Sequence, residues 1–145
     1  MEEERKKDLN EVTKNIRYKL KQLGEKYGYN VEDEVIIGKE LGEKEIIGII
    51  DVVWFQKLPF ITKKIPIFAF EIETSWRTSN ALKGDISKIS ILNPAIGVIL
   101  FPSKRLFNKP EEFDRHINAV KRYAKFMGVN NMLVWSEEDI DKFLS

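Results

Sequence analysis

Residues 65–73 constrain the fold of this chain more than any other stretch. Up to Phe70 the apolar residues occupy both odd and even positions (Ile65, Ile67, Phe68, Ala69, Phe70). Glu71 and Glu73 then follow, two residues apart. Successive side chains of a strand point to opposite faces, so a strand with two apolar faces must be covered on both sides. The two glutamates share one face, and a carboxylate there needs water, a positive partner or a metal, because burying it alone is costly.

The composition fits one folded domain spanning residues 1–145. Hydrophobic residues make up 43% and charged residues 32%, which opposes disorder. The net charge of +1 gives no overall basic signal, so a nucleic-acid surface would have to come from local clustering. With no cysteine and one histidine, disulfides and zinc sites of Cys or several His are excluded, and a metal would be a hard cation held by oxygen.

The chain carries no pattern of a secreted or membrane protein. It starts Met-Glu-Glu-Glu-Arg-Lys-Lys, which is unlike a signal peptide, and its apolar runs are too short to span a bilayer. We therefore expect a cytoplasmic protein with no membrane partner. The heavy use of Lys, Glu and Ile with no Cys would suit a thermophilic source.

Hydrophobic periodicity predicts an α/β fold with the element order α-β-β-β-α-β-α-β-α. Strands that follow a short loop are expected to pair antiparallel, and strands reached through a helix to pair parallel. The expected helices are 3–27, 79–92, 110–127 and 137–144, and the expected strands are 31–40, 44–56, 65–73, 95–101 and 131–136.

Asp51 lies within an apolar run, between Ile50 and Val52. An acid there either occupies a bulge or pairs with a lysine, or it is a metal ligand; the sequence leaves both interpretations open. Asp51 precedes Glu71 by 20 residues, which fits two neighbouring antiparallel strands and their loop. Asp51 would then meet Glu71 and Glu73 near one end of the sheet, where three carboxylates repel one another unless a divalent cation lies between them.

This arrangement resembles the PD-(D/E)XK nuclease superfamily, whose restriction-endonuclease-like fold has an αβββαβ core. Residues 3–101 match that core in order, and residues 110–144 would add an α-β-α extension. The family's aspartate falls on Asp51 and the acid of its second motif on Glu71. The motif lysine is replaced by Glu73. Some members of the superfamily are active with Glu there, others have lost activity, and a third group recruits a lysine from the next helix.

The resemblance implies a divalent-metal-dependent endonuclease that hydrolyses phosphodiester bonds in DNA. Mg²⁺ or Mn²⁺ would be held by Asp51, Glu71, Glu73 and the backbone carbonyl of Ile72. Glu73 could also act as general base. Lys83, the first candidate for a recruited lysine, would orient water or neutralise the phosphate, with Lys88 as the second candidate.

Two alternatives stay open. The chain could be a catalytically inactive nuclease-fold module that binds nucleic acid or a protein partner. The acids could also form a structural ion-pair cluster with Lys83 and Lys88.

The segment after the acidic pair offers contacts for nucleic acid. Arg77, Ser79 and Asn80 supply the side chains that commonly bind phosphate, and Lys88 would add a further cation. The alternative is an ordinary polar loop with a helix cap. Lys63-Lys64 is another candidate, although paired surface lysines usually serve solubility. A homodimer would suit the cutting of both strands of a duplex, but no residue specifies one.

Overall fold

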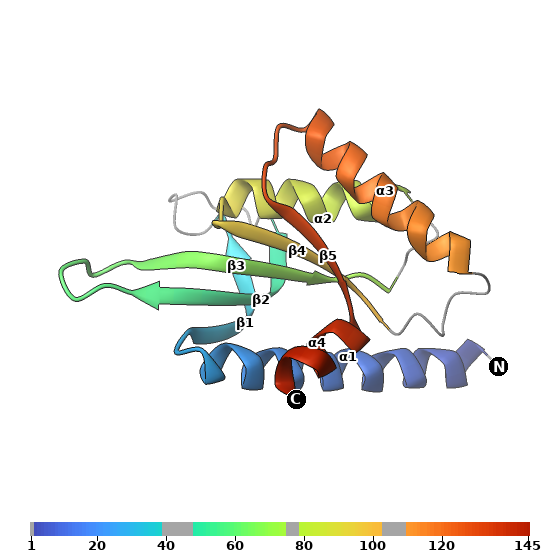
Figure 1. Ribbon diagram of the computed structural model, residues 1–145, viewed down its shortest axis with the longest axis horizontal. Coiled ribbons are helices and arrows are strands. Elements are labelled where there is room, and N and C mark those ends of the chain that lie inside the picture. Colours follow the sequence, from blue (N-terminus) through green and yellow to red (C-terminus); the bar gives the residue numbers. More distant parts are fainter. Residues whose placement is uncertain (1, 39–47, 75–78, 103–109) are drawn as a thin grey trace.

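The structure, a computed structural model, describes residues 2–38, 48–74, 79–102 and 110–145, with the backbone alone for residues 2–9, 79 and 110. Five strands form one mixed sheet in the order β1-β2-β3-β4-β5 (Figure 1). Strands β1, β2 and β3 pair antiparallel, and β4 and β5 continue the sheet in parallel. The elements are α1 (Glu2–Lys26), β1 (Asn30–Ile37), β2 (Gly48–Lys57), β3 (Lys64–Ile72), α2 (Ser79–Leu92), β4 (Ile96–Phe101), α3 (Pro110–Phe126), β5 (Met132–Ser136) and α4 (Glu137–Leu144).

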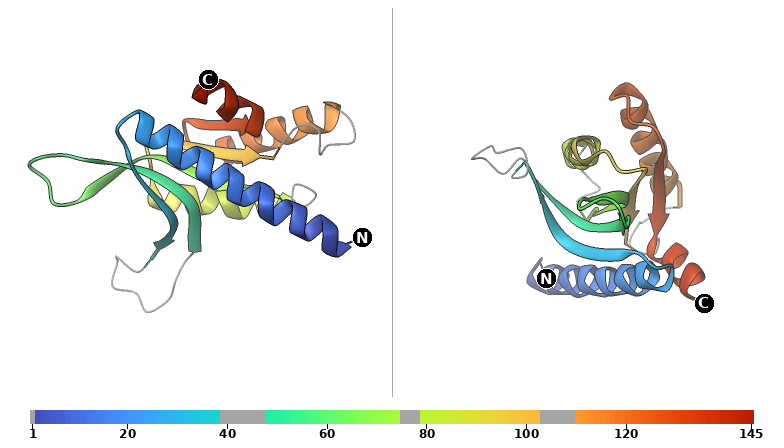
Figure 2. Two further views of the ribbon diagram at one scale, coloured as in Figure 1. Left: turned by 90° about the horizontal axis from the view of Figure 1, so that it is seen from below. Right: turned by 90° about the vertical axis from the view of Figure 1, so that its left-hand side faces the viewer.

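Helices cover both faces of the sheet, as the two-sided apolar pattern of residues 65–73 predicts. Helices α1 and α4 lie on one face, and α2 and α3 on the other (Figures 1 and 2). Adjacent strand residues divide between two cores. In β3, Ala69 belongs to the core under α2 and α3, whereas Phe70 belongs to the core that contains Leu20 of α1 and Ile140 of α4. Strand β3 is therefore central in the sheet; its first residues, in the hairpin, are exposed or half-buried, and residues 69–72 are buried.

The element order, the α/β class and the strand directions confirm the sequence predictions. Most boundaries agree within one or two residues. The described parts of the first two strands are Asn30–Ile37 and Gly48–Lys57, and residues 39–40 and 44–47 of the predicted strands lie outside the described residues. No helix in the described part of the chain has both the length and the apolar character needed to cross a membrane.

Candidate active site

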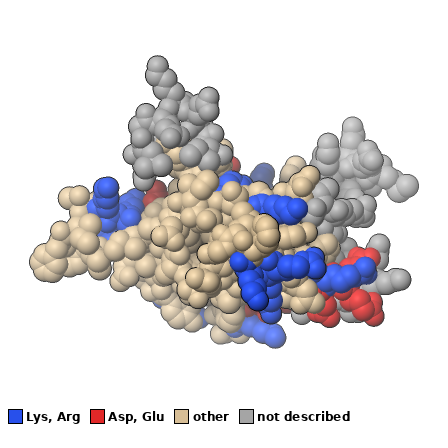
Figure 3. All heavy atoms as spheres, turned by 90° about the horizontal axis from the view of Figure 1, so that it is seen from above, with Lys and Arg blue, Asp and Glu red and all other residues tan. Residues whose placement is uncertain are grey.

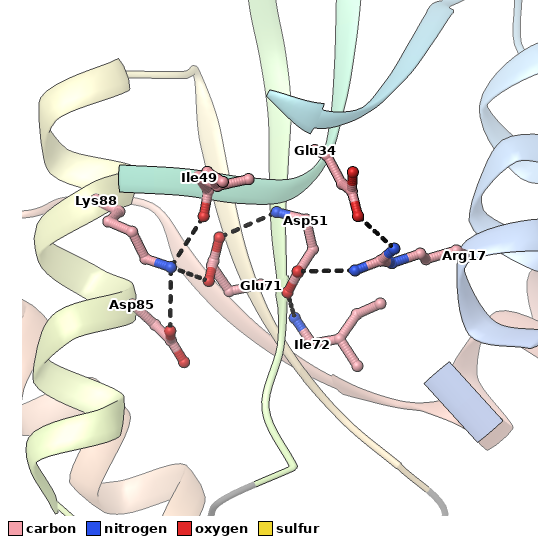
Figure 4. Close-up of polar contacts among 8 residues, drawn as sticks. All are labelled: Arg17, Glu34, Ile49, Asp51, Glu71, Ile72, Asp85 and Lys88. Carbon is pink, nitrogen blue, oxygen red and sulfur yellow. Dashed lines mark hydrogen bonds and ion pairs between the residues drawn. The ribbon is translucent and has the colours of Figure 1, made fainter. Parts of the chain in front are cut away.

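Strands β2 and β3 separate at Asp51 and Glu71. Their last backbone pairing is Val52 with Phe70. Beyond it, side chains replace the ladder: the Asp51 N–H donates to Glu71 Oε1 at 3.1 Å, and the Ile72 N–H donates to Asp51 Oδ2 at 2.7 Å (Figure 4). Two backbone donors that would otherwise be left unsatisfied are bound by carboxylates. The structure thus brings Asp51 and Glu71 together at the end of the sheet where their spacing places them.

Asp51 is also bound from α1. Arg17 Nη2 lies 3.3 Å from Asp51 Oδ1, and Arg17 Nη1 lies 3.3 Å from Glu34 Oε1. Glu34 falls opposite Asp51 in the β1–β2 register, where the pairing is interrupted, and has φ 50°. A positive φ is uncommon for a residue with a side chain and marks a local distortion of β1. Arg17 therefore holds together two acids that face each other across neighbouring strands.

Glu71 is bound from the opposite side of the sheet by Lys88 of α2. Lys88 Nζ lies 2.8 Å from Glu71 Oε2 and 3.0 Å from the carbonyl oxygen of Ile49, with Asp85 Oδ1 at 3.8 Å (Figure 4). Only 3% of the Glu71 side chain is exposed. A Cβ on Gly48 would lie 2.7 Å from Lys88 Cδ, so the glycine leaves the space through which the lysine stem passes.

The surroundings of this ion pair fix the charge of the lysine. Burial raises the pKa of Glu71, as does the charge of Asp51, while the Lys88 ammonium opposes both. Burial lowers the pKa of Lys88, but the hydrogen bond to Glu71 and the negative charge of the neighbouring acids outweigh it, so the pKa is raised overall. Lys88 is therefore a permanent positive charge at neutral pH and is unsuited to act as a base.

Glu73 and Asp85 add two acids on the α2 side of the sheet. Glu73 follows β3, is 5% exposed, and donates its N–H to the carbonyl oxygen of Leu100 at 2.9 Å. Burial, together with the neighbouring carboxylates of Glu73 and Glu71, raises the pKa of Asp85 to about 11. Asp85 Oδ2 is buried and has no hydrogen-bond partner among the described residues. Glu71 and Asp85 thus lie at the Lys88 ammonium, and Glu73 adds a third carboxyl group beside Asp85.

The other residues predicted for the site are placed as follows. Lys83 points to α3, where its Nζ lies 5.1 Å from the centre of the Tyr123 ring, and it makes no ion pair with the described acids. Lys88, predicted as a phosphate contact and only second as the recruited lysine, is the lysine at the carboxylates. Ser79 begins α2 and Asn80 is exposed in its first turn. Arg77 lies outside the described residues.

Two residues of the cluster were missed from the sequence. Asp85 had a readable signal, because it falls on the inward stripe of α2 between Leu82 and Ile86, where an acid is unusual. Arg17 had none: it is one of several cations on α1, and only the packing of α1 on the sheet shows which of them reaches Asp51.

The oxygen donors of this cluster are of the type that binds a divalent cation, but the side chains are not positioned to coordinate one. Among the described residues, no three acidic or histidine side chains are placed to hold one metal ion. The buried carboxyl of Asp85 keeps its proton beside Glu73 and Glu71, and a cation bound between these groups would relieve the repulsion among them. Oxygen-only donors suit Mg²⁺ or Mn²⁺, which would compete with Lys88 and Arg17 for Glu71 and Asp51.

Comparisons with models of known protein families, with curated proteins and with solved structures found no match to this chain.

Proposed function

We propose that this chain is a divalent-metal-dependent endonuclease that hydrolyses phosphodiester bonds in DNA, on a restriction-endonuclease-like arrangement of its core. One observation carries the proposal: α2 delivers Lys88 to Glu71 at the point where β2 and β3 part and Asp51 lies alongside. An acid from each of two antiparallel strands, with a lysine from the next helix, is the residue set that the resemblance leads us to expect when the motif lysine is absent.

Each residue type has a role in such a reaction. Asp51 and Glu71, with Glu73, would hold Mg²⁺ or Mn²⁺, which supplies Lewis-acid stabilisation and a more acidic water. Glu73 would accept the proton of the attacking water as general base. The Lys88 ammonium, kept charged by its neighbours, would offset the negative charge that builds on the phosphate during attack.

The test is cleavage of supercoiled plasmid with Mg²⁺ or Mn²⁺, comparing wild type with Glu71→Gln, Lys88→Met and Lys83→Met. Lys83 is a matched control because it lies on the same helix and points away from the carboxylates. We expect Glu71→Gln and Lys88→Met to lower the rate about a hundredfold or more, since each removes a group placed at the reacting phosphate. Lys83→Met should retain the rate, and EDTA should abolish it. Cleavage that persists in Glu71→Gln would contradict the proposal.

A catalytically inactive module is the second candidate, and a specific observation favours it. The carboxylates of Asp51 and Glu71 already bind two backbone N–H groups and two cations, which is how a purely structural cluster would be satisfied. On this alternative wild type binds DNA but cuts none with either metal, and Glu71→Gln lowers stability without altering binding.

A further inference from the structure

The hairpin that joins β2 to β3 extends well beyond the body of the molecule (Figures 1 and 2). The last cross-strand pair is Lys57 with Lys64, and the tip turns with the Ile61 N–H donating to the carbonyl oxygen of Leu58 at 3.3 Å. Every residue from 56 to 64 is exposed except the half-buried Leu58. Neither face of this tip is used to cover the cores, so its side chains are free to contact something outside the chain.

An aromatic side chain stands at the end of the hairpin. Phe60 is 96% exposed and Ile61 is 44% exposed. Single exposed apolar residues are common, but a Phe forgoes a large burial energy when it is left wholly in water. The folded chain therefore gains nothing from Phe60 by packing, and an external partner would supply the missing contact.

The hairpin is positively charged and has no acid of its own. Between Asp51 and Glu71 the charged residues are Lys57, Lys63 and Lys64. Lys64 pairs with Glu32 of β1 at 2.9 Å, whereas Lys57 and Lys63 make no ion pair with any described residue. Figure 3 shows basic side chains beside the uncharged tip at the left of the molecule, with an acidic side chain next to them. Two uncompensated cations therefore flank an exposed aromatic ring.

We infer that this hairpin is a nucleic-acid contact in which Lys57 and Lys63 bind phosphates and Phe60 stacks on a base. Phosphates attract unpaired cations without regard to sequence, and exposed aromatic rings stack on any base or wedge between base pairs. The inference rests on the proposed function for the identity of the polymer as DNA. It adds a second point of attachment, remote from the carboxylates.

The strand geometry sets the distance between the two attachment points. Lys64 and Glu71 lie seven residues apart on β3, which is about 23 Å at about 3.3 Å per residue. A duplex rises about 3.4 Å per base pair, so the hairpin would contact DNA about seven base pairs from the carboxylates. A contact at this distance positions the polymer without touching the reacting phosphate.

The test is fluorescence anisotropy in EDTA, where no cleavage occurs, with a labelled duplex of about 30 base pairs, long enough to span both points. We expect the triple variant Lys57→Gln, Phe60→Ala, Lys63→Gln to lower affinity about tenfold or more. The slope of log affinity against log salt should fall by about two, because two phosphate contacts are lost. Phe60→Ala alone should lower affinity without changing the slope.

A matched control removes the same groups from α3. Lys121→Gln, Lys125→Gln, Phe126→Ala changes the charge equally and removes a Phe that is 91% exposed, on the α2–α3 face where other cations gather (Figure 3). We expect this control to alter affinity less than about threefold, and neither triple variant to change the melting temperature by more than a degree or two.

Three results would overturn the inference: equal losses in the two triple variants, no loss in the hairpin variant, or hairpin-dependent binding to phosphatidylserine vesicles with DNA binding intact. A hairpin effect on binding without metal-dependent cleavage would retain the inference and reject the nuclease. If Glu71→Gln abolishes cleavage but the hairpin variant binds DNA as wild type does, the nuclease proposal is retained and the hairpin inference is rejected.

Discussion

At the scale of single residues, the site depends on which lysine reaches the sheet. Lys83 and Lys88 lie five residues apart, so a rotation of about 100° per residue turns them to different sides of α2. Lys88 passes over Gly48 to Glu71, and Lys83 lies against Tyr123 of α3. The sequence ranks both as candidates, but the choice follows from how α2 is seated, which depends on packing that no local pattern records.

Gly48 gives the first prediction at this scale. A methyl group in Gly48→Ala would lie within 2.7 Å of Lys88 Cδ, and the lysine must move for it to fit. We expect metal-dependent DNA cleavage to fall about tenfold or more, as when one charge-stabilising group is misplaced, with a stability loss of about 1 kcal/mol. Unchanged cleavage kinetics would show that the position of Lys88 does not matter.

The raised pKa of Asp85 leads to a prediction about how stability depends on pH. In the folded chain it keeps its proton up to a pKa of about 11, whereas in the unfolded chain it loses the proton near the ordinary value of 3.8. The unfolded state therefore releases a proton that the folded state retains, and stability falls as pH rises above about 4. In metal-free buffer, Asp85→Asn should be more stable than wild type at pH 7, by about 1–3 kcal/mol, and equal to it near pH 4.

Urea unfolding at several pH values checks this prediction. Asp33→Asn, at an exposed position on β1, is the control and should alter stability by less than about 0.5 kcal/mol at every pH. A gain for Asp85→Asn that is the same at pH 4 and pH 7 would mean that ionisation of Asp85 is not the cause.

At the scale of elements, α2 combines a buried stripe with the polar residues of the site. Leu82, Ile86 and Ile89 pack into the core while Asp85 and Lys88 reach the carboxylates. The apolar spacing is enough to predict the helix and its inward side, because those positions must leave water. It does not predict the ion pairs, which depend on side chains from β2 and β3 that only the folded sheet brings within reach.

Gly84 tests how α2 is built. A Cβ there would meet nothing within 4 Å, so the glycine is required by no contact with the described residues. We expect Gly84→Ala to stabilise the protein by about 0.5–1 kcal/mol, since alanine restricts the unfolded chain and favours the helix. Thermal unfolding measures the gain. A loss would indicate that this face of α2 needs the space, and Gly84→Ala also serves as the glycine control for Gly48→Ala.

At the scale of the whole molecule, the sequence predicts the layers and the strand directions well. Two-sided apolar strands must be covered on both faces, and a helical crossover makes the next strand parallel, so β3, β4 and β5 follow from local patterns. The meeting of Asp51 with Glu71 also follows from the hairpin spacing. Lys88 is a candidate from the sequence as a residue of the next helix, whereas Arg17 is not, because it lies 34 residues from Asp51 on a helix with several other cations.

The most direct test of the account is whether a divalent cation binds between these acids. Anomalous diffraction from crystals soaked in Mn²⁺ locates the ion without reference to activity. We expect a Mn²⁺ peak at ligand distance from the carboxylates of Asp51 and Glu71, and no such peak in Glu71→Gln crystals. A wild-type structure that binds Mn²⁺ elsewhere, with Lys88 and Arg17 still seated on Glu71 and Asp51, would contradict this prediction.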